Sequence, residues 1–563
     1  MISAANGLAR ILKAEGVSFV SLFPSCRVNN ALGDEGMPIL MMRDERFGVA
    51  VADAFSRVSN GKRFGVTTVQ GEVNAAGLEY ATGAITQAFE DSSPVLCITD
   101  GVPVGGSENS HYHIDRVFAN ITKWTGYIDQ PQRVPEMMAR AFTHLKTGRP
   151  GPVLLQVPPD LGEYDETQYP YQTVKGWRPQ ADPDDVKASI KALLAAKNPL
   201  LYVGEGIFYA DACAELVRFA ELAQVPVLTT LKGKSAFPEN HPLSIGVRGE
   251  PADHFLNTCD LLLAVGSSLS PNRFSHVIPD VKNKTIIQCT ADSADINKSY
   301  RVNQALIGDA KLVLKQLCDE LARQTGGGVK PRQWLTDDIT HLKAKMMATY
   351  EPAMTSNEKP INPYRVYQDL MNTIDRNNSF VSPESGGPRD QLSTVYEAII
   401  PHGFKGWGNV STLGFSLAAA IAARKSFPER QVVNVVGDAS IGFQLGNYEA
   451  LVRHEIGITT ILINNESFAG QGPGFWGPGR DPYTCDVSPC TVTNYAKAVE
   501  ALGEHAERVD DPKDIVPALK RAFDENSCGR PAFLEVICSK YPVWALFVGG
   551  TAKGTTRATV QRE

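Results

Sequence analysis

Short apolar runs alternate with helical patterns along most of this chain of 563 residues. Runs such as "GVTTVQG", "SPVLCITD", "GPVLLQVP" and "LLLAVGSS" are rich in β-branched residues and are flanked by Gly or Pro. Such runs are typical of buried strands in a parallel sheet with crossover helices between them. The pattern therefore predicts an α/β protein built from doubly wound parallel sheets.

Two polar stretches interrupt this pattern. Residues 161–185 are polar and Pro-rich, and residues 323–333 contain a run of glycines. We interpret both as linkers, because Gly and Pro clusters of this kind separate elements rather than form them. The expected organisation is three α/β domains followed by a tail, with the bounds 1–165, 185–325, 355–545 and 546–563.

The composition adds limits on where the protein acts and what it binds. The chain is 43% hydrophobic and 21% charged. Its net charge of −7 does not indicate a basic surface of the kind that binds nucleic acid. Its N-terminus reads as an amphipathic helix without the apolar core of a signal peptide. No run of about 18 apolar residues is present. We expect a cytoplasmic protein without nucleic-acid or membrane partners.

Residues 431–465 contain a strand–helix–strand pattern. The apolar run "QVVNVVG" is followed by Asp438, residues 443–455 have helical periodicity, and the run "ITTILI" leads to Asn465. Ligands of parallel sheets bind beyond the carboxyl ends of the strands. We therefore expect Asp438 and Asn465 to converge on one point from adjacent strands.

The residues at this predicted edge indicate a metal–diphosphate site. The oxygens of Asp438 and Asn465, with a backbone carbonyl, suit Mg²⁺ or Ca²⁺, and Mg²⁺ with few protein ligands usually shares its shell with phosphates. Gly437 lets the backbone approach closely, while Ala439 and Ser440 offer N–H groups and a hydroxyl to an anion. The alternative is a helix cap and a simple turn. The paired strand ends favour the metal site.

The sequence "GDAS", followed 27 residues after its aspartate by the second residue of "NN", resembles the cofactor signature of thiamine-diphosphate-dependent enzymes. The usual family form has Gly where this chain has Ala439. By this resemblance, Asp438, Asn465 and the carbonyl of Ser467 bind the metal, and Phe468 belongs to the cofactor-binding segment.

Two further segments resemble cofactor-binding parts of the same family. In "GNVSTLGFSLAAAIAARK" (408–425), Leu413 takes the place of the apolar residue that bends the cofactor, and the Ser411 carbonyl would accept from its aminopyrimidine. The alternative for this segment is a core helix with small residues for close packing. In "SPESGGPRD" (382–390), the diphosphate contacts implied are Ser385, Gly386 and Gly387.

The segment "ILMMRDERFGVAVADAFSRVSNGKRFGV" (39–66) resembles the family's strand with its catalytic glutamate, which falls on Glu45. Such a carboxyl group hydrogen-bonds the pyrimidine ring and promotes proton removal from the thiazolium carbon. The resemblance implies a largely buried group with a raised pKa. The alternative is a solvated charge or a salt-bridge partner among Arg43, Asp44 and Arg46.

The resemblance covers the chain to about residue 540 and implies three domains: pyrimidine-binding, central and diphosphate-binding. The order of these blocks is similar to acetolactate synthase, pyruvate oxidase, 2-oxoacid decarboxylases and 2-hydroxyacyl-CoA lyases. In this family the glutamate and the metal site come from different subunits. The implied assembly is a homodimer or tetramer with active sites across the interface.

Three loops bear on the substrate. Gln70 lies in a segment similar to the family's Gly-rich loop, and His111 and His113 lie in a segment similar to the loop that reaches the thiazolium carbon. Because histidine titrates near neutrality, both are candidate acid–base groups, although loop histidines are often merely exposed. Gln471 stands where related decarboxylases have a glutamate; it can hydrogen-bond an intermediate but cannot shuttle its proton.

The expected cofactors are thiamine diphosphate and Mg²⁺. Acetolactate synthases carry an arginine where this chain has Ser268, so simple acetolactate synthase activity is in doubt and no FAD site is expected. The first hypothesis is an acetolactate-synthase-like decarboxylase or carboligase acting on a 2-oxo acid.

Two alternatives to this hypothesis stay open at this point. The chain could be a 2-hydroxyacyl-CoA lyase or an oxalyl-CoA-type decarboxylase, with the tail 546–563 as a lid. It could instead be a homologue that binds cofactor without turnover. We discount a nicotinamide-binding turn at "VGEGIF" (203–208), because this segment lacks the full glycine fingerprint.

Overall fold

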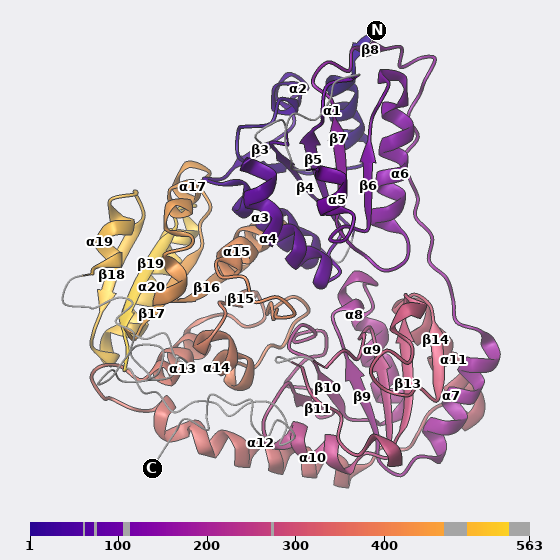
Figure 1. Cartoon of the computed structure of the whole chain (residues 1–563). Coiled ribbons are helices and arrows are strands. Elements are labelled where there is room, and N and C mark those ends of the chain that lie inside the picture. Colours follow the sequence, from indigo (N-terminus) through magenta and orange to yellow (C-terminus); the bar gives the residue numbers. More distant parts are fainter. Residues whose placement is uncertain (60–61, 72–75, 105–112, 272–274, 467–492, 540–563) are drawn as a thin grey trace, which may run out of the picture. The chain divides into compact units, whose positions relative to one another are not determined.

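A computed structural model describes residues 1–59, 62–71, 76–104, 113–271, 275–466 and 493–539. Three parallel sheets, each flanked by helices, account for the described strands except for one short ribbon (Figure 1). This confirms the predicted α/β class with three doubly wound sheets. The chain divides into two compact units, Met1–Arg178 with Asn409–Ser426, and Pro179–Gly408 with Phe427–Glu563.

The first unit contains a six-stranded parallel sheet in the order β3-β2-β4-β5-β7-β6. Apolar residues of α1 and α6 pack on one face of the sheet, while residues of α3, α4 and α5 pack on the other. The strands are β2 (Val20–Leu22), β3 (Ile39–Met41), β4 (Gly65–Val69), β5 (Val95–Asp100), β6 (Trp124–Tyr127) and β7 (Val153–Val157). The helices are α1 (Ala4–Ala14), α2 (Val28–Asp34), α3 (Glu45–Val58), α4 (Ala76–Glu90), α5 (Ile114–Phe118), η1 (Pro131–Arg133), α6 (Val134–Lys146) and α15 (Phe415–Ser426).

The predicted linker 161–185 is not entirely irregular. Within it, β8 (Glu163–Tyr164) pairs antiparallel with β1 (Ile2–Ser3), which forms a two-stranded ribbon beside the first sheet.

The second unit begins with the central sheet, whose order is β11-β10-β9-β12-β13-β14. One continuous core joins this sheet to its helices. The strands are β9 (Pro199–Val203), β10 (Val227–Thr229), β11 (Ser244–Gly246), β12 (Leu261–Val265), β13 (Thr285–Thr290) and β14 (Gln304–Ile307). The helices are α7 (Pro183–Ala195), α8 (Gly206–Tyr209), α9 (Cys213–Ala223), α10 (Glu250–Thr258), η2 (Val281–Asn283), η3 (Ser293–Asp295), α11 (Ala310–Thr325) and α12 (Gln333–Met354).

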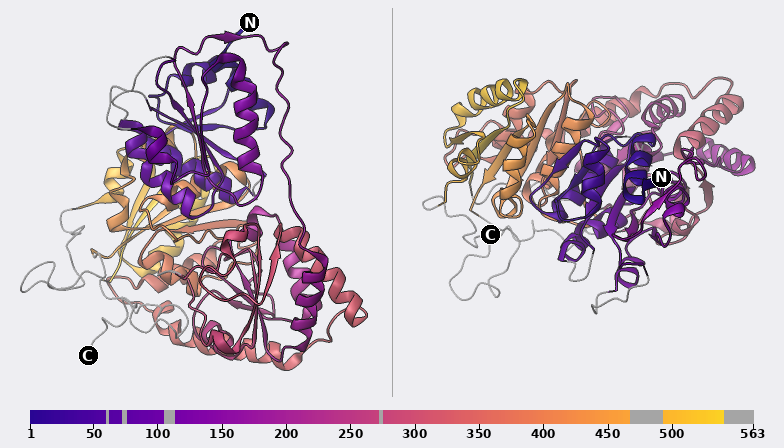
Figure 2. Two further views of the ribbon diagram at one scale, coloured as in Figure 1. Left: turned by 45° about the vertical axis from the view of Figure 1, so that its right-hand side comes forward. Right: turned by 90° about the horizontal axis from the view of Figure 1, so that it is seen from above.

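The third sheet has the order β15-β16-β17-β19-β18, and its strands also lie between helices (Figure 2). Residues of α13 and α20 form a core with one face of the sheet. The strands are β15 (Ser379–Pro383), β16 (Gln431–Gly437), β17 (Thr459–Asn464), β18 (His505–Val509) and β19 (Ala532–Ile537). The helices are α13 (Pro363–Thr373), α14 (Gly387–Val395), α16 (Asp438–Ile441), η4 (Leu445–Asn447), α17 (Tyr448–Arg453), α19 (Tyr495–Glu500), η5 (Pro512–Asp514) and α20 (Ile515–Ser527).

Two predicted helices start later than their sequence pattern suggests. The segment 408–425 becomes helical only at Phe415, because Gly408 and Gly414 adopt φ values of 151° and 100°, which no α-helix accommodates. The segment 443–455 is regular α-helix only from Tyr448 onward. Among the described helices, none combines the length and the apolar composition of a membrane span.

Candidate functional site

The carboxyl ends of three adjacent strands bring the predicted diphosphate segments to one edge of the third sheet. Gly437 pairs with Ile463 in the parallel register of β16 and β17, so the residues that follow each of them leave the sheet at the same level. On the other side of β16, Pro383 pairs with Val435. The segments after β15, β16 and β17 are therefore neighbours, as the sequence predicts for Asp438 and its partners.

Asp438 is a buried carboxylate at this edge. It is 2% exposed and begins α16 directly after β16, where its Oδ1 accepts a hydrogen bond from the Ala439 backbone N–H at 2.8 Å. Burying a carboxylate is unfavourable unless its charge is compensated. A divalent cation bound to the carboxylate oxygens would provide this compensation.

The surroundings of Asp438 suit a phosphate-bearing ligand. Ser440 is 2% exposed, and its Oγ has no hydrogen-bond partner among the described residues. Apart from Gly437 and its two chain neighbours, no described residue has an atom within 4 Å of the place that a Cβ on Gly437 would occupy. An unpaired buried hydroxyl beside open backbone can donate to an anion without displacing another contact. The described residues at this edge therefore fit the predicted metal–diphosphate group.

Asn465 follows β17 and is half-buried. Its predecessor Asn464 is fully buried and holds the turn: its Nδ2 donates to Glu535 Oε1 on β19 at 2.8 Å, and its Oδ1 accepts from the Glu466 N–H at 3.3 Å. Glu535 also accepts from the Ala496 N–H at 3.0 Å. Glu535 was not predicted from the sequence, where its only signal is a charged residue inside the apolar run "AFLEVI".

The segment after β15 offers a second place for an anion. Gly386 has a φ of 96°, a left-handed value that favours glycine, and it precedes α14, which begins at Gly387. Beyond its two chain neighbours, a Cβ at Gly386 would meet no atom of the described residues within 4 Å. Ser385 is half-buried, and its N–H donates to Oε1 of Glu384, a fully buried residue. Glu384 therefore holds the backbone at the start of the segment that contains the predicted diphosphate contacts.

In the first unit, Glu45 is the first residue of α3, immediately after the N-cap Asp44. It is half-buried in the single chain, and its Oε1 accepts from the Ser25 hydroxyl at 3.0 Å. Among the ion pairs of the described residues none involves Glu45, so the salt-bridge alternative has no support there.

The residues that hold Ser25 were not predicted from the sequence. Asp100, at the end of β5, is 1% exposed and accepts from the Arg27 N–H at 3.0 Å and from the Cys26 thiol at 3.3 Å. Asp100 thus fixes the loop that carries Ser25 against Glu45. The signal was present in the run "VLCITD", where a buried strand ends on a carboxylate.

Two other predicted residues occupy the same edge of the first sheet. Gln70 follows β4 and is half-buried, and its carbonyl accepts a hydrogen bond from the Leu78 N–H on α4 at 3.0 Å. His113 precedes α5, beyond β5, and is also half-buried. The ends of β2 and β4 therefore bring the Ser25 loop and Gln70 to one edge. His113 lies near the same edge, because Asp115, two residues further on, accepts a hydrogen bond from Gln156 Nε2 near the end of β7 at 2.6 Å.

The segment with Ser411 and Leu413 belongs to the first unit, where α15 packs against α3 (Figure 1). The Leu413 carbonyl accepts from Arg46 Nη1 at 3.1 Å, and both Ser411 and Leu413 are half-buried. Arg57, fully buried on α3, lies 4.8 Å from the ring of Phe415. Within one chain, the residue next to Glu45 thus contacts the backbone of the predicted wedge residue.

Four predicted site residues lie outside the described residues: His111, Ser467, Phe468 and Gln471. The tail 546–563 also lies outside them.

Comparison with known proteins gives matches along most of the chain. Three family models of thiamine pyrophosphate enzymes match this chain. The model of the N-terminal TPP binding domain matches residues 2–122, that of the central domain matches residues 186–317, and that of the C-terminal TPP binding domain matches residues 390–536. These three matches follow the order of the three sheets.

Whole-length relatives are found among curated enzymes. A probable acetolactate synthase large subunit of Methanocaldococcus jannaschii is 29% identical, and the match covers 95% of this chain and 92% of that protein. The acetolactate synthase isozyme 3 large subunit of Escherichia coli is 24% identical, with 95% of each chain covered. A glyoxylate carboligase of Escherichia coli O157:H7 is also 24% identical, over 95% of this chain and 93% of its own length.

Proposed function

This chain belongs to the thiamine pyrophosphate-dependent enzymes, and we propose that it binds thiamine diphosphate through Mg²⁺ to cleave or form a carbon–carbon bond beside the carbonyl of a 2-oxo acid. The observation that carries this proposal is the buried carboxylate of Asp438 at the edge from which Asn465 also leaves the sheet.

The metal–diphosphate end of the cofactor would be held by residues of the second unit. Asp438 and Asn465 would supply carboxylate and amide oxygens to Mg²⁺, with the carbonyl of Ser467 as a further ligand. The unpaired Ser440 hydroxyl would donate to a phosphate oxygen. The start of α14, after Gly386, would add backbone N–H groups to the same anion.

Bound thiamine diphosphate supplies a carbon nucleophile and an electron sink for the bond that breaks. Glu45 would hold a proton against the pyrimidine nitrogen, and Ser25 would keep its carboxyl group in one orientation through their 3.0 Å hydrogen bond. Gln70 and His113, at the same edge of the first sheet, would hydrogen-bond the substrate. Leu413 would press on the cofactor from the loop before α15.

The relatives and the residues together support the proposed substrate class. Acetolactate synthase and glyoxylate carboligase are names of enzymes that join 2-oxo acid units, and Glu45, Asp438 and Asn465 provide the parts that such turnover needs. Retention of all three side chains also speaks against a homologue without turnover. FAD has no part in this proposal.

We also propose a homodimer or tetramer with the active sites across a subunit interface. Glu45 is only half-buried in the single chain, whereas the proposed proton-holding role favours a shielded carboxyl group. A partner subunit would supply the missing cover.

A substrate panel tests the reaction. Protein reconstituted with thiamine diphosphate and Mg²⁺ is incubated with pyruvate, glyoxylate or phenylpyruvate, and separately with a 2-hydroxyacyl-CoA, while CO₂ release and products are measured by mass spectrometry. We expect CO₂ and a carboligation product from at least one 2-oxo acid. Cleavage of the 2-hydroxyacyl-CoA alone would replace this proposal with an acyl-CoA lyase, and complete inertness would favour a non-catalytic homologue.

A further inference from the structure

A cavity of about 200 Å³ lies at the amino ends of three adjacent strands of the central sheet. Its lining includes Asn198, Pro226 and Cys259, which precede β9, β10 and β12 respectively. Helices α10 and α12 close the other sides. Cofactors of parallel sheets bind at the opposite, carboxyl edge, so this cavity is separate from the site proposed above and does not rest on it.

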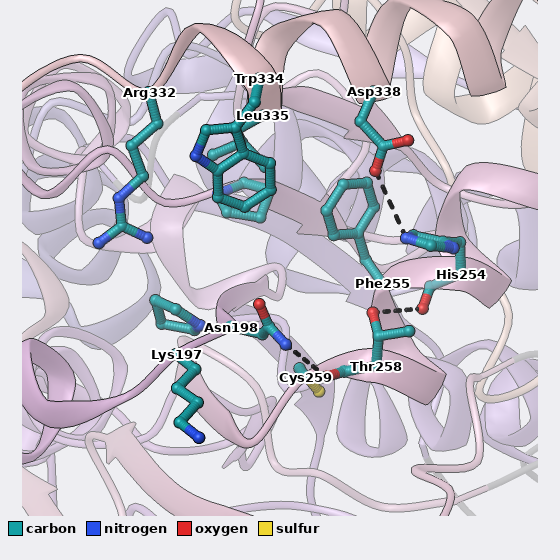
Figure 3. Close-up of a pocket in the computed structure, with 12 residues that line it drawn as sticks. Lys197, Asn198, His254, Phe255, Thr258, Cys259, Arg332, Trp334, Leu335 and Asp338 are labelled. Atoms are coloured by element: carbon teal, nitrogen blue, oxygen red, sulfur yellow. Dashed lines mark hydrogen bonds and ion pairs between the residues drawn. The ribbon is translucent and has the colours of Figure 1, made fainter.

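Two cationic side chains stand on one side of this cavity. Lys197 is exposed and Arg332 is half-buried, and among the described residues neither side chain forms an ion pair. The Asp260 carboxylate accepts hydrogen bonds from the backbone N–H groups of Lys197 and Asn198, at 2.8 Å each, and not from the Lys197 ammonium group. Figure 3 places Lys197 and Arg332 on the same side of the cavity. Their charges are therefore available to an anion.

The other side of the cavity carries Asp338, the one carboxylate among the described lining residues. There His254 Nε2 lies 3.4 Å from Asp338 Oδ2 (Figure 3). The described lining residues thus carry two cationic side chains, Lys197 and Arg332, against one carboxylate, so an anionic ligand is favoured over a neutral or cationic one.

The middle of the cavity is aromatic and apolar. Trp334 is 58% exposed, although a large indole is normally placed where it can bury its surface, while Phe255 and Leu335 are 8% and 3% exposed. Figure 3 shows the indole of Trp334 and the ring of Phe255 above Asn198 and Cys259. An exposed indole beside buried apolar side chains offers a surface on which a planar ring can stack.

From these features we propose that the cavity binds a small planar aromatic anion. The ring would lie against Trp334 and Phe255, and a carboxylate or phosphate group would lie between Lys197 and Arg332. The volume supports this size, because pockets for drug-sized ligands measure about 300–1,000 Å³, and 200 Å³ suits a single ring with a short acidic group.

Calorimetric titration of the full-length protein tests the proposal with three probes. Benzoate, phenyl phosphate and benzamide share a ring but differ in charge and in the acidic group. We expect one or both anions to bind and benzamide to bind at least tenfold more weakly, with the anion affinity falling as the salt concentration rises. Preference between benzoate and phenyl phosphate identifies the acidic group. Equal affinity for benzamide and the anions, or no binding at millimolar concentration, would overturn the proposal.

Variants locate the binding to this cavity. Lys197→Ala combined with Arg332→Ala should weaken anion binding at least tenfold, and Trp334→Leu should weaken it severalfold while keeping apolar bulk. The matched control is Lys191→Ala with Arg301→Ala, which removes one Lys and one Arg, both exposed, from the same domain outside the cavity. Anion binding that survives the first pair, or that falls equally in the control pair, would place the ligand elsewhere.

Discussion

Asp438 directly follows an apolar run, and a carboxylate in such a place needs a compensating partner. The structure places it 2% exposed beside the end of β17, where the sequence predicts a ligand site. The roles of Ser25, Asp100 and Glu535 could not be predicted in the same way. Each acts through a partner distant in sequence, and the identity of that partner depends on which strands are adjacent.

The charge of Asp438 gives the first prediction. Asp438→Asn keeps the size of the side chain and its hydrogen-bonding oxygen but removes the charge that would bind Mg²⁺. We expect Mg²⁺-dependent retention of thiamine diphosphate to fall at least tenfold, measured by calorimetry, while thermal stability changes little. Glu449→Gln, which removes a carboxylate that pairs with Arg453 on the neighbouring α17, is the control. Unchanged cofactor affinity in Asp438→Asn would exclude Asp438 as a metal ligand.

A buried histidine in the central domain gives a pH prediction. His276 is 6% exposed, its Nε2–H donates to the Val247 carbonyl at 2.6 Å, and its Nδ1 accepts from the Tyr202 hydroxyl at 3.2 Å. Burial lowers the pKa of His276 from 6.5 to about 4. Below pH 6.5 the unfolded chain therefore gains a proton at His276 that the folded chain does not take up until about pH 4. The contribution of His276 to the free energy of unfolding is thus complete above pH 6.5 and is lost as the pH falls from 6.5 to about 4.

This difference in proton uptake lowers the free energy of unfolding by about 2 kcal/mol between pH 7 and pH 5. The change is measured as the pH dependence of the thermal midpoint of the wild type and of His276→Gln, which keeps a donor for Val247 and cannot titrate. The variant should be less sensitive to pH over this range. Identical pH profiles would contradict the assignment.

At the scale of elements, strands were more predictable than helix starts. Buried parallel strands are continuous apolar runs, and all three sheets follow from them. The start of α15 depends on the backbone angles of Gly408 and Gly414, which composition alone does not reveal. Residues 443–455 contain the short η4 before α17, so their helical periodicity overstates the regular structure.

The link between β17 and β19 gives a prediction at this scale. Glu535→Ala would leave the Asn464 amide and the Ala496 N–H without their buried acceptor, at a cost of about 1–3 kcal/mol per unpaired group. We expect a lower thermal midpoint and, because the turn at Asn465 would loosen, a raised KM for Mg²⁺ at a nearly unchanged kcat. Glu525→Ala, which removes a half-buried partner of the exposed Arg530, should alter neither quantity. A loss of stability with unaltered Mg²⁺ affinity would limit Glu535 to a structural role.

At the scale of the whole molecule, the sequence predicts the number and order of the three sheets but not the grouping of α15. The packing of α15 on α3 depends on contacts such as Arg57 with Phe415, between residues far apart in the chain. Sequence periodicity identifies the apolar face of a helix but not the helix that covers it.

Subunit mixing tests the proposed cross-subunit site. Glu45→Gln should keep thiamine diphosphate bound yet lose about 10²–10⁴-fold in rate, and Asp438→Ala should lose cofactor retention. When the two variants are co-expressed with different tags, the mixed dimer contains one site with both native residues if each site spans two chains. Activity in the purified mixed species, absent from either parent, would support the interface site. A mixed species as inactive as its parents would place Glu45 and Asp438 of one site on the same chain.

The proposed function depends above all on Mg²⁺-assisted binding of thiamine diphosphate, and calorimetric titration of the wild-type protein tests this binding without any variant. With Mg²⁺ present, we expect saturable binding at one cofactor per chain, and with the metal chelated we expect binding at least tenfold weaker. No uptake in magnesium buffer, or equal uptake with and without the metal, would contradict the proposed function.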